Sequence, residues 1–326
     1  MLFKRIKICY NVAMQSKFGN NKISSLLGEP TRAKASGLTY SLSAVMAVAV
    51  AFVFLFILTV LGVNVETGQE PDWYLYCNYA LTSLAFVLTA AFIVRWNKMA
   101  WKEGLKAQKC APKYYLLAVL LQIGLLSLSE LNTLFLNFLA KFGYVDTPIR
   151  LPSLEGFGFF GVLLVVALLP ALFEEIIFRG FLLKGMGSFG TVGAVLLCGG
   201  LFSLYHQNPA QTLYQFCCGA AFALVAVRSG SILPTVLSHF INNALIITLQ
   251  KFGVTAFSPT VFVLILIVSA LCLTGSLIWL VFFEKRTLET GDKGNEKMVR
   301  KEFLTFAALG IGLCALTWLS VLLTNI

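Results

Sequence analysis

Long apolar stretches separated by short polar segments dominate this sequence of 326 residues. Several stretches reach about 18 residues or more, enough for an α-helix to cross the ~30 Å hydrocarbon core of a bilayer. A chain in lipid must satisfy its backbone N–H and C=O groups internally, and a helix does so within one segment. Only 12% of the residues are charged, whereas a soluble domain carries about 25%. The sequence therefore predicts an all-α protein, a polytopic bundle of transmembrane helices.

We expect about eight to nine spans. Their apolar boundaries fall at residues 38–63, 74–94, 114–138, 156–184, 191–207, 211–227, 232–249, 260–283 and 303–323. The chain then divides into four parts: a basic N-terminal arm (1–37), N-terminal transmembrane helices (38–150), a block of four helices with very few charges (151–250), and C-terminal transmembrane helices (251–326).

The basic residues are distributed unevenly. Most of the 25 Lys and Arg residues lie in residues 1–37, 95–113 and 284–302, which alternate with apolar spans. Such an excess marks cytoplasmic loops, so we expect a cytoplasmic N-terminus. Basic segments beside spans contact anionic membrane lipids rather than nucleic acid. The stretch EEIIFRGFLL looks bacterial, which would place this multi-pass protein in a bacterial plasma membrane; nothing in the sequence indicates its oligomeric state.

The segment FEEIIFRG, residues 173–180, places three charged side chains inside an apolar span. A charge in the hydrocarbon layer costs about 2.5 kcal/mol or more and usually marks function. Glu175 and Arg179 are four residues apart, so on a helix they can form an ion pair. Glu174 points elsewhere and remains free to accept a proton. The alternative is a purely structural charge cluster, because salt-bridge networks occur in membrane proteins as well.

The two histidines, His206 and His239, both lie in the charge-poor block. Histidine transfers protons near neutral pH and also ligates metals. Asn243 follows His239 by four residues and shares its helix face, and Asn242, three residues on, is an alternative amide. A lone histidine in a membrane is more often a hydrogen-bonding partner between helices. However, polar groups in lipid must satisfy one another, so we expect these residues to converge with the glutamates and supply a base, a proton shuttle and oxyanion donors for hydrolysis.

Glu130 interrupts the third span, together with Asn132 and Asn137. It is a candidate second functional carboxylate. More often such a residue faces a polar cavity or a partner helix, or its segment is partly interfacial. We therefore assign it no role.

Three motifs follow one another in the charge-poor block: EExxxR from Glu174, FxxxH from Phe202 and HxxxN from His239. Together they resemble the CAAX-protease and bacteriocin-processing (CPBP, or Abi) family of intramembrane proteases, of the CAAX prenyl protease 2 type. The resemblance covers about residues 155–250. It implies a four-helix catalytic core that hydrolyses a peptide bond near the membrane. In the family's best-known branch, the substrate is the C-terminus of a prenylated protein, from which the last three residues are removed.

The resemblance also implies a role for each motif residue. Glu174 would be the general base that activates water, and His206 would help to bind that water. His239 and Asn243 would stabilise the oxyanion. Three further residues would support the site, Glu175 and Arg179 by organising it and Phe202 by packing beneath the cavity.

Metal dependence is left open by the resemblance, because the family has been described as metalloproteases and as metal-free glutamate proteases. Glu174, His206 and His239 are the three residues that could ligate a zinc ion with an open position. The chain has no HExxH motif, however, and its histidines lie 33 residues apart. We therefore expect no tightly bound metal.

Two other classes of function compete with a protease. One is a non-catalytic membrane scaffold or bacteriocin self-immunity protein of the same fold. The other is a transporter, since buried carboxylates and histidines are typical of transporters too. The three intact motifs favour the enzyme.

Overall fold

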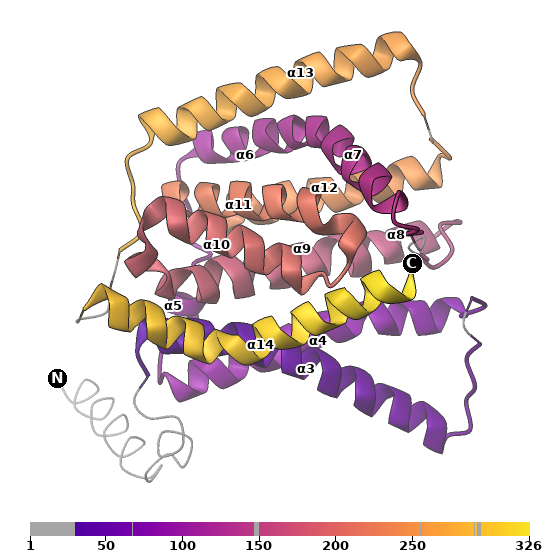
Figure 1. Ribbon diagram of the computed structural model, residues 1–326, viewed down its shortest axis with the longest axis horizontal. Helices are drawn as coiled ribbons and strands as arrows, with labels where there is room; N and C mark the ends of the chain where they lie inside the picture. The colour runs from indigo at the N-terminus through magenta and orange to yellow at the C-terminus, as the bar shows by residue number, and fades with distance from the viewer. Residues whose placement is uncertain (1–29, 67, 147–149, 255, 290, 292–294) are drawn as a thin grey trace, which may run out of the picture.

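The computed structural model describes residues 30–326, except residues 67, 147–149, 255, 290 and 292–294. Most of the expected basic arm, residues 1–29, lies outside the described residues. The described chain forms a bundle of helices without strands (Figure 1). Its α-helices are α3 (Arg32–Val60), α4 (Asp72–Trp96), α5 (Trp101–Leu105), α6 (Pro112–Leu125), α7 (Ser129–Ala140), α8 (Gly158–Val162), α9 (Leu169–Glu175), α10 (Gly190–Tyr205), α11 (Thr212–Ser229), α12 (Leu233–Lys251), α13 (Pro259–Ile278) and α14 (Glu296–Thr324).

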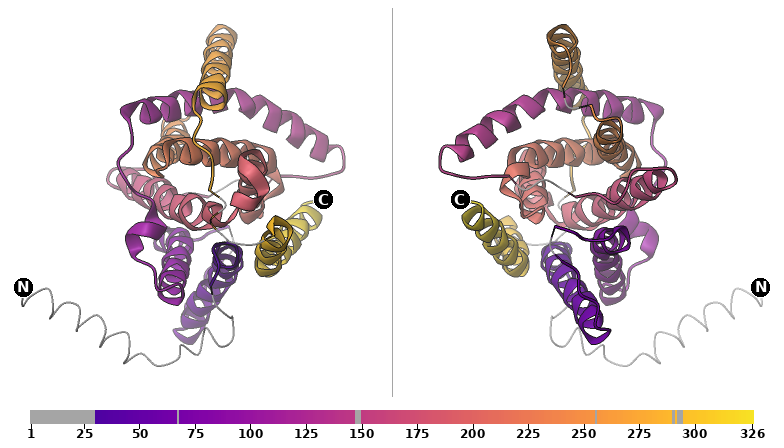
Figure 2. Two further views of the ribbon diagram at one scale, coloured as in Figure 1. Left: turned by 90° about the vertical axis from the view of Figure 1, so that its left-hand side faces the viewer. Right: turned by 90° about the vertical axis from the view of Figure 1, so that its right-hand side faces the viewer.

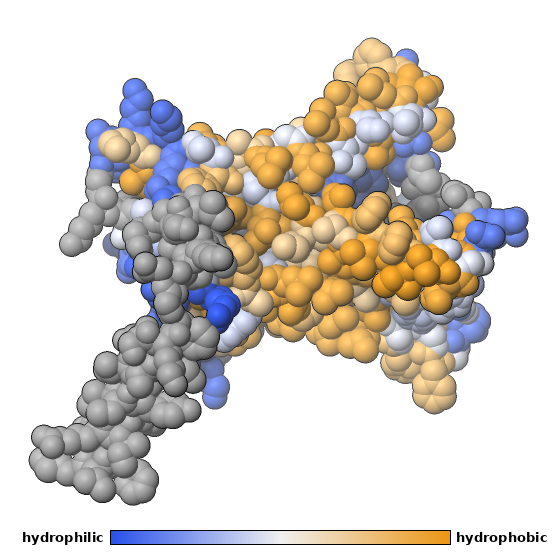
Figure 3. All heavy atoms as spheres, turned by 90° about the horizontal axis from the view of Figure 1, so that it is seen from below, coloured by the Kyte–Doolittle hydropathy of each residue, from blue (hydrophilic) through white to orange (hydrophobic). Residues whose placement is uncertain are grey.

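Eight helical stretches among the described residues are long and apolar enough to cross a membrane, which confirms the expected all-α transmembrane bundle. The remaining expected span, α12, is a helix of 19 residues but is not one of the eight. It carries several polar residues, including His239 and both asparagines. Figure 3 shows the apolar belt of the molecule between two hydrophilic ends.

Two expected boundaries were wrong by about two turns. The first helix begins at Arg32 rather than residue 38, and the last begins at Glu296 rather than residue 303. In each case a polar side chain caps the helix outside the apolar run. Thr31 accepts a hydrogen bond from the Lys34 N–H, and Asn295 accepts one from the Lys297 N–H. Capping lets a helix continue into the polar interface, so residues 32–37 belong to a helix and not to an irregular arm.

The helices form layers around a central group. α8 to α12 lie in the middle, with α6, α7 and α13 on one side and α3, α4 and α14 on the other (Figures 1 and 2). The central helices include those that carry the three motifs.

The helix that carries Glu174 runs over Gly158–Gly185 and is irregular in two places. π-helical segments, Leu163–Leu168 and Ile176–Leu182, flank α9. Such segments are frequent at functional sites, because an inserted residue rotates the side chains that follow it. Pro170, near the start of α9, lacks the N–H that would donate to the Val166 carbonyl in a regular helix.

α10 and α11 approach each other closely at two glycines. A Cβ on Gly219 would lie 2.9 Å from the Gly199 Cα and 3.0 Å from the Phe202 Cβ. Small residues are a common means of close helix packing in membranes. This contact brings the FxxxH motif on α10 against α11.

Gly219→Ala is expected to lower the free energy of unfolding by about 1–3 kcal/mol, because its methyl group would overpack the α10–α11 contact. Gly200 is the matched control, since nothing lies within 4 Å of a Cβ built there. Gly200→Ala is expected to be neutral or to stabilise the helix by about 0.5–1 kcal/mol. Thermal unfolding in detergent, monitored by size-exclusion chromatography, measures the stability of both variants. Equal effects would contradict the close contact.

Candidate active site

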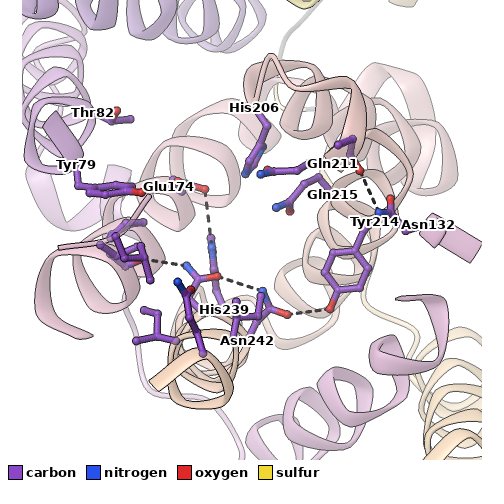
Figure 4. A pocket seen from close by; sticks show the side chains of 18 of the residues that line it. Tyr79, Thr82, Asn132, Glu174, His206, Gln211, Tyr214, Gln215, His239 and Asn242 are labelled. Atoms are coloured by element: carbon purple, nitrogen blue, oxygen red, sulfur yellow. Dashed lines mark hydrogen bonds and ion pairs between the residues drawn. The ribbon is translucent and has the colours of Figure 1, made fainter. Parts of the chain in front are cut away.

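A cavity of about 620 Å³ lies among the central helices and is lined by all three motifs. Glu174, His206, His239 and Asn243 all reach it, and Figure 4 shows the labelled side chains surrounding it. The other polar residues of the lining are Tyr79, Thr82, Ser83, Ser129, Asn132, Thr133, Gln211, Tyr214, Gln215, Asn242 and Gln250. The expected convergence of the motif residues is therefore present.

The two adjacent glutamates have different surroundings. The Glu174 side chain is 13% exposed, and its Oε2 lies 3.9 Å from the His239 Nε2. This oxygen has no hydrogen-bond partner in the protein. Glu175 is fully buried, and its Oε1 accepts a hydrogen bond of 2.9 Å from Arg179, the ion pair expected from their spacing. Glu175 Oε2 also lacks a hydrogen-bond partner, but Glu175 does not line the cavity and Glu174 does. Glu174 is therefore the carboxylate that water or a substrate can reach.

Arg179 lies behind the cavity and is fully buried. Besides Glu175, it donates to the Gly219 carbonyl at 2.9 Å. Its guanidinium carbon lies 4.4 Å from the centre of the Phe202 ring, within the range of a cation–π contact. Phe202 is itself buried and does not line the cavity. Arg179 and Phe202 therefore hold the helices around the site together but do not line the cavity.

His206 lies at a turn inside the bundle. α10 ends at Tyr205 after 16 residues, and a short helical turn, Pro209–Gln211, leads into α11. A simple zigzag of full-length spans would place His206 near the far membrane surface, away from Glu174. The short α10 and the inward turn bring it to the cavity instead. Its Nδ1 lies 2.8 Å from the Phe202 carbonyl, which can only accept, so Nε2 is the nitrogen left for the cavity.

His239 is held between a carboxylate and aromatic rings. Its Nδ1 lies 3.0 Å from Glu175 Oε1 and donates to it. The Phe202 and Phe222 rings lie 6.0 and 5.8 Å from the imidazole, centre to centre. A carboxylate on Nδ1 fixes the tautomer and the orientation of the ring. His239 therefore presents its Nε2 toward the space beside Glu174.

Asn243 is oriented by its neighbours on two helices. Its Oδ1 accepts a hydrogen bond of 3.1 Å from the Asn242 side chain, so its Nδ2 faces the motif helix. There it lies 3.4 Å from the Val166 carbonyl, the group that Pro170 leaves without a regular helical donor. One Nδ2 hydrogen remains for the cavity.

Sequence reasoning missed the residues that hold Asn242. Its Oδ1 accepts hydrogen bonds of 2.8 Å from both Gln122 and Tyr214. These two bonds orient the amide, so that its NH₂ group points to Asn243. Gln122 is a lone amide in the apolar run YYLLAVLLQIGLL, and this was the available signal. The Tyr214 hydroxyl gave no comparable signal.

Tyr214→Phe is expected to lower kcat about tenfold with little change in KM, because losing one hydrogen bond of about 1.4 kcal/mol frees the Asn242 amide to turn. Tyr79→Phe is the matched control. Tyr79 also lines the cavity, but its hydroxyl donates to the Arg150 carbonyl and not to the asparagines. Steady-state kinetics on a peptide substrate gives both constants. A pure KM effect in Tyr214→Phe, or an equal kcat loss in Tyr79→Phe, would contradict a role in orienting Asn243.

A three-ligand zinc site does not fit the described residues. No group of three His, Cys, Asp or Glu side chains in this part of the chain is placed to hold one metal ion. We therefore derive no step through a metal.

Glu130 lies outside this constellation. It is exposed near the start of α7, which follows a short break in the third span, and it does not line the cavity. Asn132 does line it, and donates to the Ala210 carbonyl at 3.0 Å.

Comparison with known proteins agrees with the geometry. Residues 156–245 match the family described as Type II CAAX prenyl endopeptidase Rce1-like. This range contains all three motifs. No curated protein and no solved structure gives a significant match to the chain. The chain is thus a multi-pass membrane protein whose residues 156–245 match an Rce1-like CAAX-protease domain.

Proposed function

We propose that this protein is an intramembrane endopeptidase that hydrolyses a peptide bond with a water molecule activated by Glu174. One observation carries the proposal. Glu174, the one carboxylate among the described lining residues, has an oxygen without a protein hydrogen-bond partner and lies beside two imidazoles and an amide. These are the groups that general-base hydrolysis requires.

In this mechanism, His206 Nε2 and Glu174 hold the water between them. Glu174 takes a proton as the water oxygen bonds to the carbonyl carbon, and the carbonyl oxygen becomes an oxyanion. Asn243 donates to that oxyanion through Nδ2–H. His239 donates to it through Nε2–H in the imidazolium form, whose Nδ1–H donates to Glu175. The C–N bond then breaks, and the proton on Glu174 passes to the leaving amine.

The lining supports an uncharged peptide segment as the bound group. Amides and hydroxyls surround the cavity, and no lysine or arginine is among its described lining residues. Such groups pair with peptide N–H and C=O groups, which is how polar groups in ligand sites fix orientation. The family description supports a peptide or a prenylated protein C-terminus as the general class of substrate.

Hydrolysis by the purified protein tests the proposal. The protein, reconstituted in lipid vesicles permeabilised with detergent, is incubated with a peptide library in ¹⁸O-labelled water and a metal chelator. We expect discrete cleavage products that carry ¹⁸O in the new carboxyl group. Peptide binding without cleavage would instead indicate a scaffold or immunity protein and would overturn the proposed reaction.

A further inference from the structure

The cavity extends in only one direction from the site residues. On α12 its lining runs from His239 to Gln250, near the C-terminal end of the helix. On the motif helix it runs from Glu174 back to Val166, toward the N-terminal end. These two helix ends are neighbours, since Lys251 donates to the Leu154 carbonyl at 2.7 Å. Along both helices, the cavity therefore extends from the catalytic residues toward the same end of the bundle.

The other lining helices agree on this direction. α4 contributes residues 79–86, from the half of the helix that follows Asp72. α11 contributes only its start, up to Gln215, and the third span contributes residues 126–133, beyond its midpoint. Each segment lies in the half of the bundle that contains α8 and the C-terminus (right in Figure 1). We call this end the open end.

Side-chain exposure rises toward the open end. The His239 side chain is only 7% exposed. Ile246, two turns further along α12, is 54% exposed, and Gln250 is exposed as well. On α7, Ser129 and Thr133 are also exposed. The cavity is therefore deep at the catalytic groups and open away from them.

The opposite end is closed by packing. Every residue from 176 to 183 on the motif helix is buried. Phe181 packs against α5, and its carbonyl accepts a hydrogen bond of 2.8 Å from Ser36. Beside it, the loops before α6 and α12 are joined, because Gln108 donates to the Gly230 carbonyl at 2.9 Å and Ile232 donates to the Lys106 carbonyl at 3.2 Å. We call this end the sealed end.

The two ends carry opposite charge. The sealed end holds the described parts of the basic segments, 95–113 and 284–302 among them. Burial, and then repulsion from Lys184, Arg286 and Arg32, lower the pKa of Lys106 to about 8. In the loops and helix ends of the open end, five acids (Glu66, Glu70, Asp72, Asp146 and Glu155) outnumber three basic residues (Lys141, Arg150 and Lys251). By the positive-inside rule, the sealed end faces the cytoplasm.

We propose that the active-site cavity receives its substrate from the extracytoplasmic face of the membrane, so that the substrate is an uncharged polypeptide segment exposed on that face. The segment belongs to an exported chain or to the outer part of a membrane protein. That the bound molecule is a substrate rests on the proposed peptidase function, whereas the direction of access rests on the geometry of the cavity and the charge of the two ends.

Thiol labelling from one side of the membrane tests the direction. Gln215→Cys places a thiol in the cavity, and Lys109→Cys places one on the exposed loop at the sealed end. Each variant is treated with a permanently charged methanethiosulfonate in right-side-out and in inverted membrane vesicles. Tandem mass spectrometry assigns the label to residue 215 or 109 separately from the neighbouring native cysteines, Cys217, Cys218 and Cys110, which stay in place.

We expect modification at residue 215 to be at least about tenfold faster in right-side-out vesicles, and modification at residue 109 to show the reverse preference, because a fixed charge does not cross the hydrocarbon core. Modification at residue 215 from the inverted side, or from neither side, would overturn the proposal. Modification at residue 109 from the outer side would overturn it too, since the sealed end would then not be cytoplasmic.

The same vesicles separate this inference from the proposed function. An added impermeant peptide is expected to be cleaved only by right-side-out vesicles. Labelling with the expected sidedness but no cleavage in any preparation would refute the peptidase and leave the direction of access intact. Cleavage by the purified protein combined with reversed labelling would refute the direction and leave the peptidase intact.

Discussion

Glu174→Gln is expected to abolish peptide hydrolysis, with a loss of about 10²–10⁴ in kcat, the range that general-base catalysis supplies. The amide has the size of the carboxylate but cannot take a proton from water. Because the Glu174 Oε2 has no hydrogen-bond partner in the protein, the substitution breaks no hydrogen bond of that oxygen. The protein should therefore remain folded and inserted, as size-exclusion chromatography in detergent would report.

Glu130→Gln is the matched control, since Glu130 is also a carboxylate within a transmembrane stretch but lies outside the cavity lining. It is expected to leave kcat and KM unchanged. Retained turnover in purified Glu174→Gln would refute its assignment as the base. An equal loss in Glu130→Gln would show that the assay responds to membrane carboxylates in general and not to the cavity.

Glu175→Gln is expected to destabilise the protein by about 3–5 kcal/mol, the cost of leaving a buried charge without its partner. Arg179 is fully buried, and Glu175 is the one carboxylate among the described residues that pairs with it. The substitution keeps the size of the side chain, so the loss is one of charge. We expect a large fall in the thermal midpoint, and lower kcat in the folded fraction, because Glu175 also holds His239.

A second ion pair in the chain provides the comparison. Glu296 and Arg300 are also four residues apart, at 2.8 Å, but Glu296 is 63% exposed. Glu296→Gln is expected to change the free energy of unfolding by at most about 1 kcal/mol, as for exposed ion pairs generally. If both substitutions had the same small effect, burial would not increase the contribution of the Glu175–Arg179 pair to the free energy of unfolding.

Features with a local cause could be predicted from the sequence. The membrane-spanning helices follow from runs of apolar residues, because a bilayer requires both apolar side chains and internal hydrogen bonding. The division between Glu174 and Glu175 follows from helix periodicity, which places Arg179 one turn from Glu175 only. Helix starts at Arg32 and Glu296 were misplaced, since hydropathy reports the apolar run and not the capping residues before it.

Features that join distant segments required the tertiary structure. Lipid is as apolar as leucine, so hydropathy does not specify which helices pack together; small residues and polar contacts do. The Gly199–Gly219 contact, the inward turn that brings His206 to Glu174, and the bonds from Gln122 and Tyr214 to Asn242 are all of this kind. The sequence by itself determined that polar groups in the membrane had to meet. Only the packing of the helices decided which amide faces the cavity and toward which end of the bundle it opens.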